Sequence, residues 1–210
     1  MMMKTLGGLL ATFLLVASTA AAPPQGRFVE RALSHVQFQQ LGAGGFVIYM
    51  RHGKTDVTRP DQPDLVFRDC QTQRPLNEEG RQMSVEIGAA LRAGRIPISE
   101  IYVSPMCRTR ESAELVFGND ASFIVLDDLF SSTNQTSEQK KPIIATTRRL
   151  LSMPVPPGKN RFILAHAPNL ADTMGYFPKA EGTVVVFIPM GDHFEYVGSI
   201  RPDMWSRLLR

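Results

Sequence analysis

Four groups of residues whose side chains bind anions or carry protons each follow a short apolar run. In chain order, the groups are Arg51-His52-Gly53 after 46–50, Ser104 to Arg108 after 101–103, Asp127-Asp128 after 123–126, and His166 after 162–165. Short apolar runs separated by helical patterns are typical of strands buried on both faces of a parallel sheet. Ligands bind outside the carboxyl ends of such strands, so we expect the four groups at one edge of the sheet.

Together, these side chains could bind a dianion beside a nucleophile. Arg51 and Arg108 each present a planar, permanently charged fork that matches a phosphate. Arg108 would also lie in the first turn of a helix, where free backbone N–H groups favour an anion. Beside two guanidinium groups the cationic form of His52 is disfavoured, which leaves a ring nitrogen free to attack. Gly53 is expected to let the backbone turn sharply, so that Arg51 and His52 both reach the site.

Each group also has a plainer interpretation. An Arg-His-Gly triplet arises by chance in some chains of this length, and Arg108 could be an ordinary surface arginine. His166 could be a hydrogen-bonded core histidine, and Asp127 or Asp128 could begin a turn. The joint placement of all four groups after apolar runs favours the shared site.

The segments between the runs predict helices. Strands that alternate with helices indicate an α/β fold with three layers, in which helices flank a mostly parallel sheet. The expected elements are a helix from its cap Asn77 to Gly94, a helix from its cap Ser104 through Pro105 to Gly118, a less clearly marked helix within 135–152, and a C-terminal hairpin of 183–188 and 194–200.

The composition is that of an ordinary soluble globular protein. Of the 210 residues, 43% are apolar and 20% are charged, which is enough chain for one sizeable core. The formal net charge of +3 is small and the basic residues do not cluster. We therefore expect no nucleic-acid partner.

The amino terminus has the pattern of a secretory signal peptide. Lys4 precedes the apolar run from Leu6 to Val16, and small residues follow as far as Ala22. The run is shorter than the roughly 20 residues of a membrane span, although an uncleaved anchor is the alternative. We expect a signal peptide at 1–21, a single domain at 22–210, a periplasmic or secreted protein, and no stable membrane anchor after cleavage.

Export would carry Cys70 and Cys107 into an oxidising compartment, where two cysteines can persist as a disulfide. The alternative is a buried, inert thiol at Cys107 in a helix and a free Cys70 in a loop. A bridge would tie the loop after the Arg-His-Gly triplet to the helix that carries Arg108, and would stiffen the anion site.

Four sequence blocks form a characteristic set: Arg51 to Thr55, Pro75 to Gln82, Ser104 to Thr109, and Leu164 to Asn169. In their order and spacing these blocks resemble the histidine phosphatase (phosphoglycerate-mutase-like) superfamily. The chain is especially similar to small exported members grouped with lipopolysaccharide heptose-phosphate phosphatases. The resemblance implies a histidine phosphatase-like fold and a phosphatase that works through a phosphohistidine, without a metal ion or other cofactor.

The resemblance also assigns roles to single residues. It implies Asp128 as the acid that protonates the leaving oxygen, with Asp127 in reserve, and here the chain departs from the usual Glu. The short connection 129–141 stands where larger relatives carry a cap, which implies an open site and broad or bulky substrates. The other implied roles are nucleophile for His52, phosphate clamps for Arg51 and Arg108, and hydrogen-bond donor to the phosphoryl oxygens for His166.

These features predict a phosphomonoester hydrolase that acts outside the cytoplasm on a phosphorylated small molecule or an envelope glycan. One alternative is a phosphotransferase or mutase of the same fold, against which the signal peptide argues. The other is a catalytically silent phospholigand-binding protein, which the departure at Asp128 leaves open. The natural substrate and the oligomeric state do not follow from the sequence.

Overall fold

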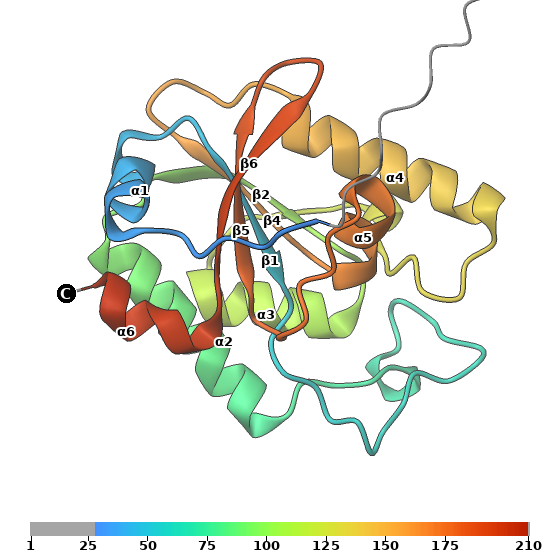
Figure 1. Cartoon of the computed structure of the whole chain (residues 1–210). Coiled ribbons are helices and arrows are strands. Elements are labelled where there is room, and N and C mark those ends of the chain that lie inside the picture. Colours follow the sequence, from blue (N-terminus) through green and yellow to red (C-terminus); the bar gives the residue numbers. More distant parts are fainter. Residues whose placement is uncertain (1–27, 210) are drawn as a thin grey trace, which may run out of the picture.

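The computed structural model describes residues 28–209 as one sheet flanked by helices (Figure 1). The signal peptide predicted at 1–21 lies outside the described residues. The helices are α1 (His35–Gln40), α2 (Glu78–Ala93), α3 (Cys107–Phe117), α4 (Ser137–Ser152), α5 (Ala167–Met174) and α6 (Trp205–Leu208). The strands are β1 (Val47–Arg51), β2 (Ile98–Val103), β3 (Ile124–Val125), β4 (Asn160–Ala165), β5 (Val184–Pro189) and β6 (Phe194–Ile200).

The six strands follow the order β3-β2-β4-β1-β5-β6. β3, β2, β4 and β1 run parallel, whereas β5 pairs antiparallel with β1 and β6 antiparallel with β5. The predicted mostly parallel sheet and the C-terminal hairpin at its side are therefore confirmed. Because β2, β4 and β1 are adjacent and parallel, the residues that follow them lie at one edge of the sheet.

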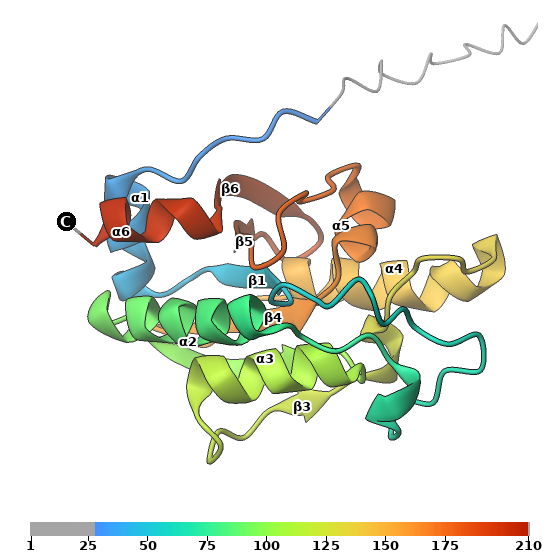
Figure 2. The same cartoon turned by 90° about the horizontal axis from the view of Figure 1, so that it is seen from below.

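Each face of the sheet carries its own core. Alternate residues of a strand point to opposite faces, so Met50 packs in one core and Tyr49 in the other. The first core contains side chains of α1, α2, α3 and α6, and the second contains side chains of α4 and α5. Figure 2 shows α2 and α3 side by side. The predicted three-layer arrangement is confirmed.

Two of the predicted helices are confirmed together with their caps or bounds. The side chain of Asn77 accepts a hydrogen bond from the Gly80 N–H, which caps α2, and the helix ends before Gly94 as expected. The less clearly marked prediction within 135–152 corresponds to α4, which Thr136 caps in a reciprocal pair with Gln139.

The start of α3 differs from the prediction. The helix begins at Cys107, and its cap residue is Met106, whose backbone is extended. Ser104 was expected to cap this helix with Pro105 at its first position. Instead, the Ser104 hydroxyl lies 2.8 Å from Nε2 of His166. The segment from Ser104 to Met106 connects β2 to α3, and through Ser104 it contacts the residue that follows β4.

The third strand also differs from the prediction of a strand buried on both faces. β3 has two residues, and the side chains of Ile124 and Val125 are 51% and 42% exposed. The reason is its place at the edge of the sheet, where only β2 pairs with it.

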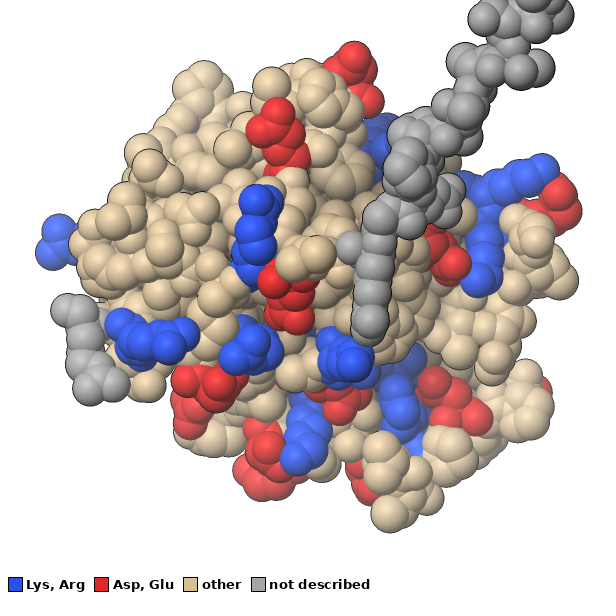
Figure 3. Space-filling view, viewed as in Figure 1, with Lys and Arg blue, Asp and Glu red and all other residues tan. Residues whose placement is uncertain are grey.

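On the face shown in Figure 3, several Lys and Arg side chains lie in a row across the lower part with Asp and Glu side chains next to them, and much of the upper left carries neither. Within residues 28–209, no helix combines the length and the apolar character that a membrane crossing requires.

Candidate active site

Two histidines meet at the carboxyl ends of β1 and β4. Arg51, the last residue of β1, pairs with Ala165, the last residue of β4, so His52 and His166 follow at the same level. Their ring centroids are 5.3 Å apart, and the two residues are 3% and 1% exposed. The buried Tyr49 hydroxyl donates to the His166 carbonyl at 2.8 Å and accepts from its N–H at 3.1 Å, which fixes this backbone.

The hydrogen bond of His52 identifies which of its ring nitrogens can react. Nδ1 lies 2.9 Å from the carbonyl oxygen of Gly53. A carbonyl only accepts hydrogen bonds, so Nδ1 carries the proton and Nε2 of the neutral ring keeps its lone pair. Burial, and after it the charges of Arg108 and Arg51, hold the pKa of His52 well below its usual value, against the opposing effect of the Gly53 carbonyl. His52 is therefore neutral at pH 7.

Gly53 serves close packing rather than a sharp turn, which corrects the expected role. Its φ is outside the left-handed region. A Cβ on Gly53 would lie 2.5 Å from the Gly80 carbonyl oxygen and 2.8 Å from Oγ of Ser84, both on α2. Only glycine allows the end of β1 to approach α2 so closely, and this approach places His52.

Both predicted arginines lie beside the histidines, and each has a buried N–H group that makes no hydrogen bond within residues 28–209. Nη1 of Arg51 donates to the carbonyls of Pro178 and Lys179, and Nη1 of Arg108 pairs with Asp61 at 2.9 Å. Nε of each arginine is buried without a hydrogen-bond partner in the described part of the chain. Buried N–H groups are rarely left unpaired, so such donors indicate room for an anion.

A third arginine, which the sequence analysis missed, belongs to the same cluster. Arg74 lines a hollow of about 300 Å³ together with Arg108 and Asp61, and its Nε is also buried and unpaired within residues 28–209. Its charge contributes to the lowered pKa of both His52 and His166. The clue in the sequence is its position directly before the Pro75 block.

His166 shares the environment of His52. Burial, followed by the charges of Arg108 and of the His52 ring, lowers the pKa of His166 well below its usual value. Nε2 of His166 meets the Ser104 hydroxyl at 2.8 Å. A dianion at the arginines would oppose these positive charges and favour proton uptake by the ring, as a donor to phosphoryl oxygens requires.

The two lowered pKa values predict that stability falls as the pH falls below about 6.5. Below that pH the unfolded chain binds protons at His52 and His166 that the folded chain does not yet bind. Each histidine should therefore cost about 1.4 kcal/mol of unfolding free energy per pH unit, until the pH reaches its folded-state pKa. Urea unfolding at pH 7, 6 and 5 measures this, and His52→Gln should flatten the slope. Equal slopes for the variant and the wild type would contradict the assignment.

Glu181 is a further missed residue, and it lies on the Nδ1 side of His52. Its carboxylate accepts from the Thr55 hydroxyl at 2.8 Å and lies 3.4 Å from Nη2 of Arg51. Oε1 lies 3.8 Å from Nδ1 of His52, which is no ion pair while the ring is neutral. Glu181 therefore holds the backbone after His52 in place through Thr55 and orients Arg51.

The structure does not bring the two predicted acids to this cluster. Asp127 and Asp128 are exposed in the turn after β3. Oδ2 of Asp128 accepts a 3.4 Å hydrogen bond from Thr146 on α4. Among the described contacts, no hydrogen bond or ion pair joins either carboxylate to the two histidines or to Arg51 and Arg108. Their assignment as the proton donor stays a prediction.

A large hollow opens beside Arg108. Its volume is about 650 Å³, and residues of the loop that follows β1 and of the loop that precedes α4 line it. Phe67 and Phe130 face each other across these loops with ring centroids 5.7 Å apart. Polar side chains add hydrogen-bonding groups to the wall: Gln62, Ser131, Thr133, Asn134 and Gln135. The hollow can hold the organic part of a bulky ligand.

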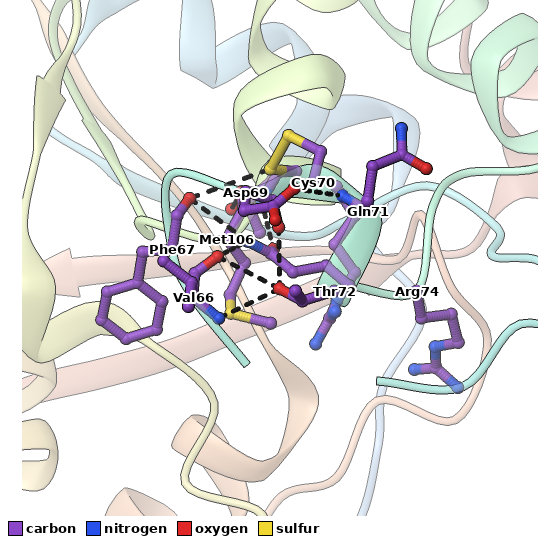
Figure 4. Close-up of a disulfide and its surroundings, with 12 residues drawn as sticks. Val66, Phe67, Asp69, Cys70, Gln71, Thr72, Arg74 and Met106 are labelled. Carbon is purple, nitrogen blue, oxygen red and sulfur yellow. Dashed lines mark hydrogen bonds between the residues drawn. A yellow bond between two sulfur atoms is a disulfide. The ribbon is translucent and has the colours of Figure 1, made fainter. Parts of the chain in front are cut away.

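A disulfide joins Cys70 to Cys107 and so resolves the alternatives that the sequence left open (Figure 4). Their Cα atoms are 5.7 Å apart, and Cys107 directly precedes Arg108. Gln73 adds to the tether, because its side-chain oxygen accepts from the Cys107 N–H at 2.7 Å and its amide donates to the Phe67 carbonyl. The loop that lines the hollow is thus fixed to the start of α3, as the predicted bridge would require.

Replacing both cysteines, as in Cys70→Ser with Cys107→Ser, should lower the free energy of unfolding. The bridge closes a loop with a sequence separation of 37 residues. In the chain-entropy model such a loop corresponds to about 4 kcal/mol of stabilisation, and typical measured values for disulfides are about 2–4 kcal/mol. Urea unfolding of the variant and of the oxidised and reduced wild type measures the difference. If all three unfold at the same urea concentration, the tether does not stabilise the fold.

Within residues 28–209, no group of three or more His, Cys, Asp or Glu side chains is arranged to hold a metal ion. The positive charge at the site comes from Arg51, Arg74 and Arg108, and the candidate nucleophile is Nε2 of His52. A tetrahedral dianion is the ligand that this arrangement fits best.

Comparisons with known proteins bear on the fold. No curated protein matches the chain. The structure of the protein histidine phosphatase SixA complexed with tungstate is similar with a TM-score of 0.51 at 18% identity, over 75% of this chain and 97% of that one. Phosphoglycerate mutase from Bacillus anthracis str. Sterne is similar with a TM-score of 0.50 at 11% identity, over 81% and 100%. Residues 47–133 match the histidine phosphatase superfamily (branch 1), and the chain has a histidine phosphatase-like fold.

Proposed function

We propose that the protein is a phosphomonoester hydrolase that works through a phosphohistidine, without a metal ion, on a substrate outside the cytoplasm. The observation that carries the proposal is a buried, neutral His52 with Nε2 unprotonated, beside Arg51 and Arg108. A nucleophile held next to permanently charged donors is what transfer of a phosphoryl group requires.

In the proposed reaction, the phosphate binds between Arg51, Arg108 and His166. The Nε2 lone pair of His52 forms a bond to phosphorus while the bond to the ester oxygen breaks. A carboxylic acid gives its proton to that oxygen, and the alcohol leaves. Water then attacks the phosphohistidine, its proton returns to the carboxylate, and the N–P electron pair returns to Nε2. The arginines stabilise the charge on the phosphoryl oxygens in both steps.

Two features support a site of action outside the cytoplasm, in the periplasm or the medium. The Cys70–Cys107 disulfide is of the kind that persists in oxidising compartments. The amino-terminal sequence has the pattern of a signal peptide. The hollow of about 650 Å³ beside Arg108 supports a bulky substrate, such as a phosphorylated sugar or an envelope glycan like heptose phosphate in lipopolysaccharide.

One observation favours a second candidate, a phospholigand-binding protein without turnover. The predicted acid Asp128 is exposed and bonded to Thr146 instead of facing His52. Such a protein would keep the arginine cluster and bind phosphate, but it would release no product.

Incubation of the purified, oxidised protein with phenyl phosphate separates the candidates. Hydrolysis predicts steady release of inorganic phosphate and, in rapidly quenched samples, a phosphoryl adduct on His52 by mass spectrometry. A binding protein predicts protection against thermal unfolding without product, and a mutase predicts transfer to an added phosphoglycerate rather than to water. Absence of both product and adduct would refute the hydrolase. Phosphorylated sugars, lipopolysaccharide fragments and phosphopeptides then define the substrate class.

A further inference from the structure

The proposed reaction needs a carboxylic acid at the arginine cluster, on the side away from His52. An in-line attack places the leaving oxygen opposite Nε2, toward the space where the organic group is held. Glu181 does not meet this condition, since it lies on the Nδ1 side and is occupied by Thr55 and Arg51. Asp128 does not line the hollows beside Arg108.

Asp61 is a carboxylate at the arginine cluster that also lines the hollow proposed for the organic group. It lines both the hollow of about 650 Å³ and the smaller hollow of about 300 Å³, and Arg108 lines the same two. Oδ1 of Asp61 lies 2.9 Å from Nη1 of Arg108, and Oδ2 lies 3.3 Å from the same nitrogen. The carboxylate thus touches the phosphate clamp where the hollow for the organic group begins.

The two oxygens of Asp61 have different surroundings. Oδ1 accepts from the Arg74 backbone N–H at 2.8 Å as well as from Arg108, so it is fixed by two donors. Within residues 28–209, Oδ2 has only the longer contact to Arg108, and the side chain is 33% exposed. Oδ2 is therefore the atom that can take up and release a proton.

We propose that Asp61 is the acid and base of this site, an inference that rests on the proposed phosphatase function. The proton on Oδ2 passes to the ester oxygen as the P–O bond breaks, and the alcohol leaves. The same oxygen then takes a proton from the attacking water, which restores the acid as phosphate forms.

The loop that carries Asp61 is held in place, which supports a role of Asp61 as the acid. Asp61 lies on the loop that the disulfide and Gln73 hold against the start of α3, where Arg108 is located. A proton donor must stay within hydrogen-bond reach of the leaving oxygen, which an untethered loop position would not guarantee.

The test compares Asp61→Asn with the wild type on two substrates. Asparagine keeps an oxygen for the Arg74 N–H and for Arg108, but it loses the negative charge and the proton that can be transferred. For glycerol phosphate, whose alkoxide leaves poorly, kcat/KM should fall about 100-fold. For p-nitrophenyl phosphate, whose leaving group needs no proton, it should fall only a few-fold. The wild-type kcat for glycerol phosphate, which reports on the substrate-bound site, should also decline at high pH, and the variant should lack this decline.

Asp64→Asn, an exposed residue of the same loop, is the matched control for the loss of one charge and should behave as the wild type on both substrates. Equal losses of kcat/KM on both substrates for Asp61→Asn would overturn the proposal, because the effect of a purely structural residue does not depend on the leaving group. A substrate-dependent loss in Asp128→Asn instead would assign the acid to Asp128. Release of p-nitrophenol by the wild type, absent in His52→Ala, shows that the phosphatase function stands whichever carboxylate is the acid.

Discussion

His52→Ala should lower the rate of phosphate release by at least about 10⁴-fold, because it removes the nucleophile itself. The variant keeps Arg51 and Arg108, so it should still bind a tetrahedral oxyanion. Steady-state hydrolysis of phenyl phosphate measures the loss of turnover. Protection by inorganic phosphate or tungstate against thermal unfolding measures the retained binding.

The matched control is His193→Ala, in the turn between β5 and β6, where the imidazole is exposed and contacts Asp192. This variant should hydrolyse phenyl phosphate at the wild-type rate. If His52→Ala folds, binds phosphate and still releases product at a comparable rate, then Nε2 of His52 is not the nucleophile and the proposed mechanism fails.

Arg108→Ala should lower kcat/KM by about 10²- to 10³-fold. Removal of a positive donor that faces developing charge has an effect of this size in other enzymes. Arg108 is nearly fully buried and lies in the first turn of α3. Arg108→Lys should recover part of the loss, since lysine restores a point charge but not the planar fork.

Arg110→Ala provides the control on the same helix. Its side chain lines a different hollow, together with Cys70 and Glu114. Turnover should be unchanged in Arg110→Ala, and the urea midpoints of both variants report on folding. A full rate for a folded Arg108→Ala protein would exclude this arginine from the phosphate clamp.

The sequence predicts the central part of the site because that part follows a simple rule. His52, Ser104 and His166 each follow a parallel strand, and parallel strands that are neighbours end at the same edge. The alternation of apolar runs and helical patterns was enough to identify the strands. The order of the strands in the sheet does not follow from the sequence. Their common direction is sufficient to place these residues at one edge of the sheet.

The residues that sequence analysis missed do not follow that rule. Glu181 precedes β5, and because β5 is antiparallel its beginning, not its end, lies at the site. Asp61 and Arg74 lie in the long loop between β1 and α2, whose path depends on the Cys70–Cys107 bridge and on Gln73. Neither periodicity nor turn chemistry predicts where such a loop returns to the sheet.

The errors about Ser104 and Gly53 have a common physical cause. Both residues were interpreted through local backbone preferences, as a helix cap and as a turn. In the fold, tertiary contacts decide their roles, since the Ser104 hydroxyl meets His166 and Gly53 packs against Gly80. Local propensity is a weak guide where two elements meet at a site.

The shortness of β3 affects how readily molecules of this protein can associate through strand pairing in concentrated solution. An exposed sheet edge offers unpaired backbone donors and acceptors to which a neighbouring molecule can add a strand. β3 presents only two residues of such an edge, and the negative charges of Asp127 and Asp128 follow at once. Whatever their role in catalysis, these two aspartates disfavour the addition of a strand from another molecule at the β3 edge of the sheet. Apolar replacements of Asp127 and Asp128 would therefore favour intermolecular strand pairing at this edge.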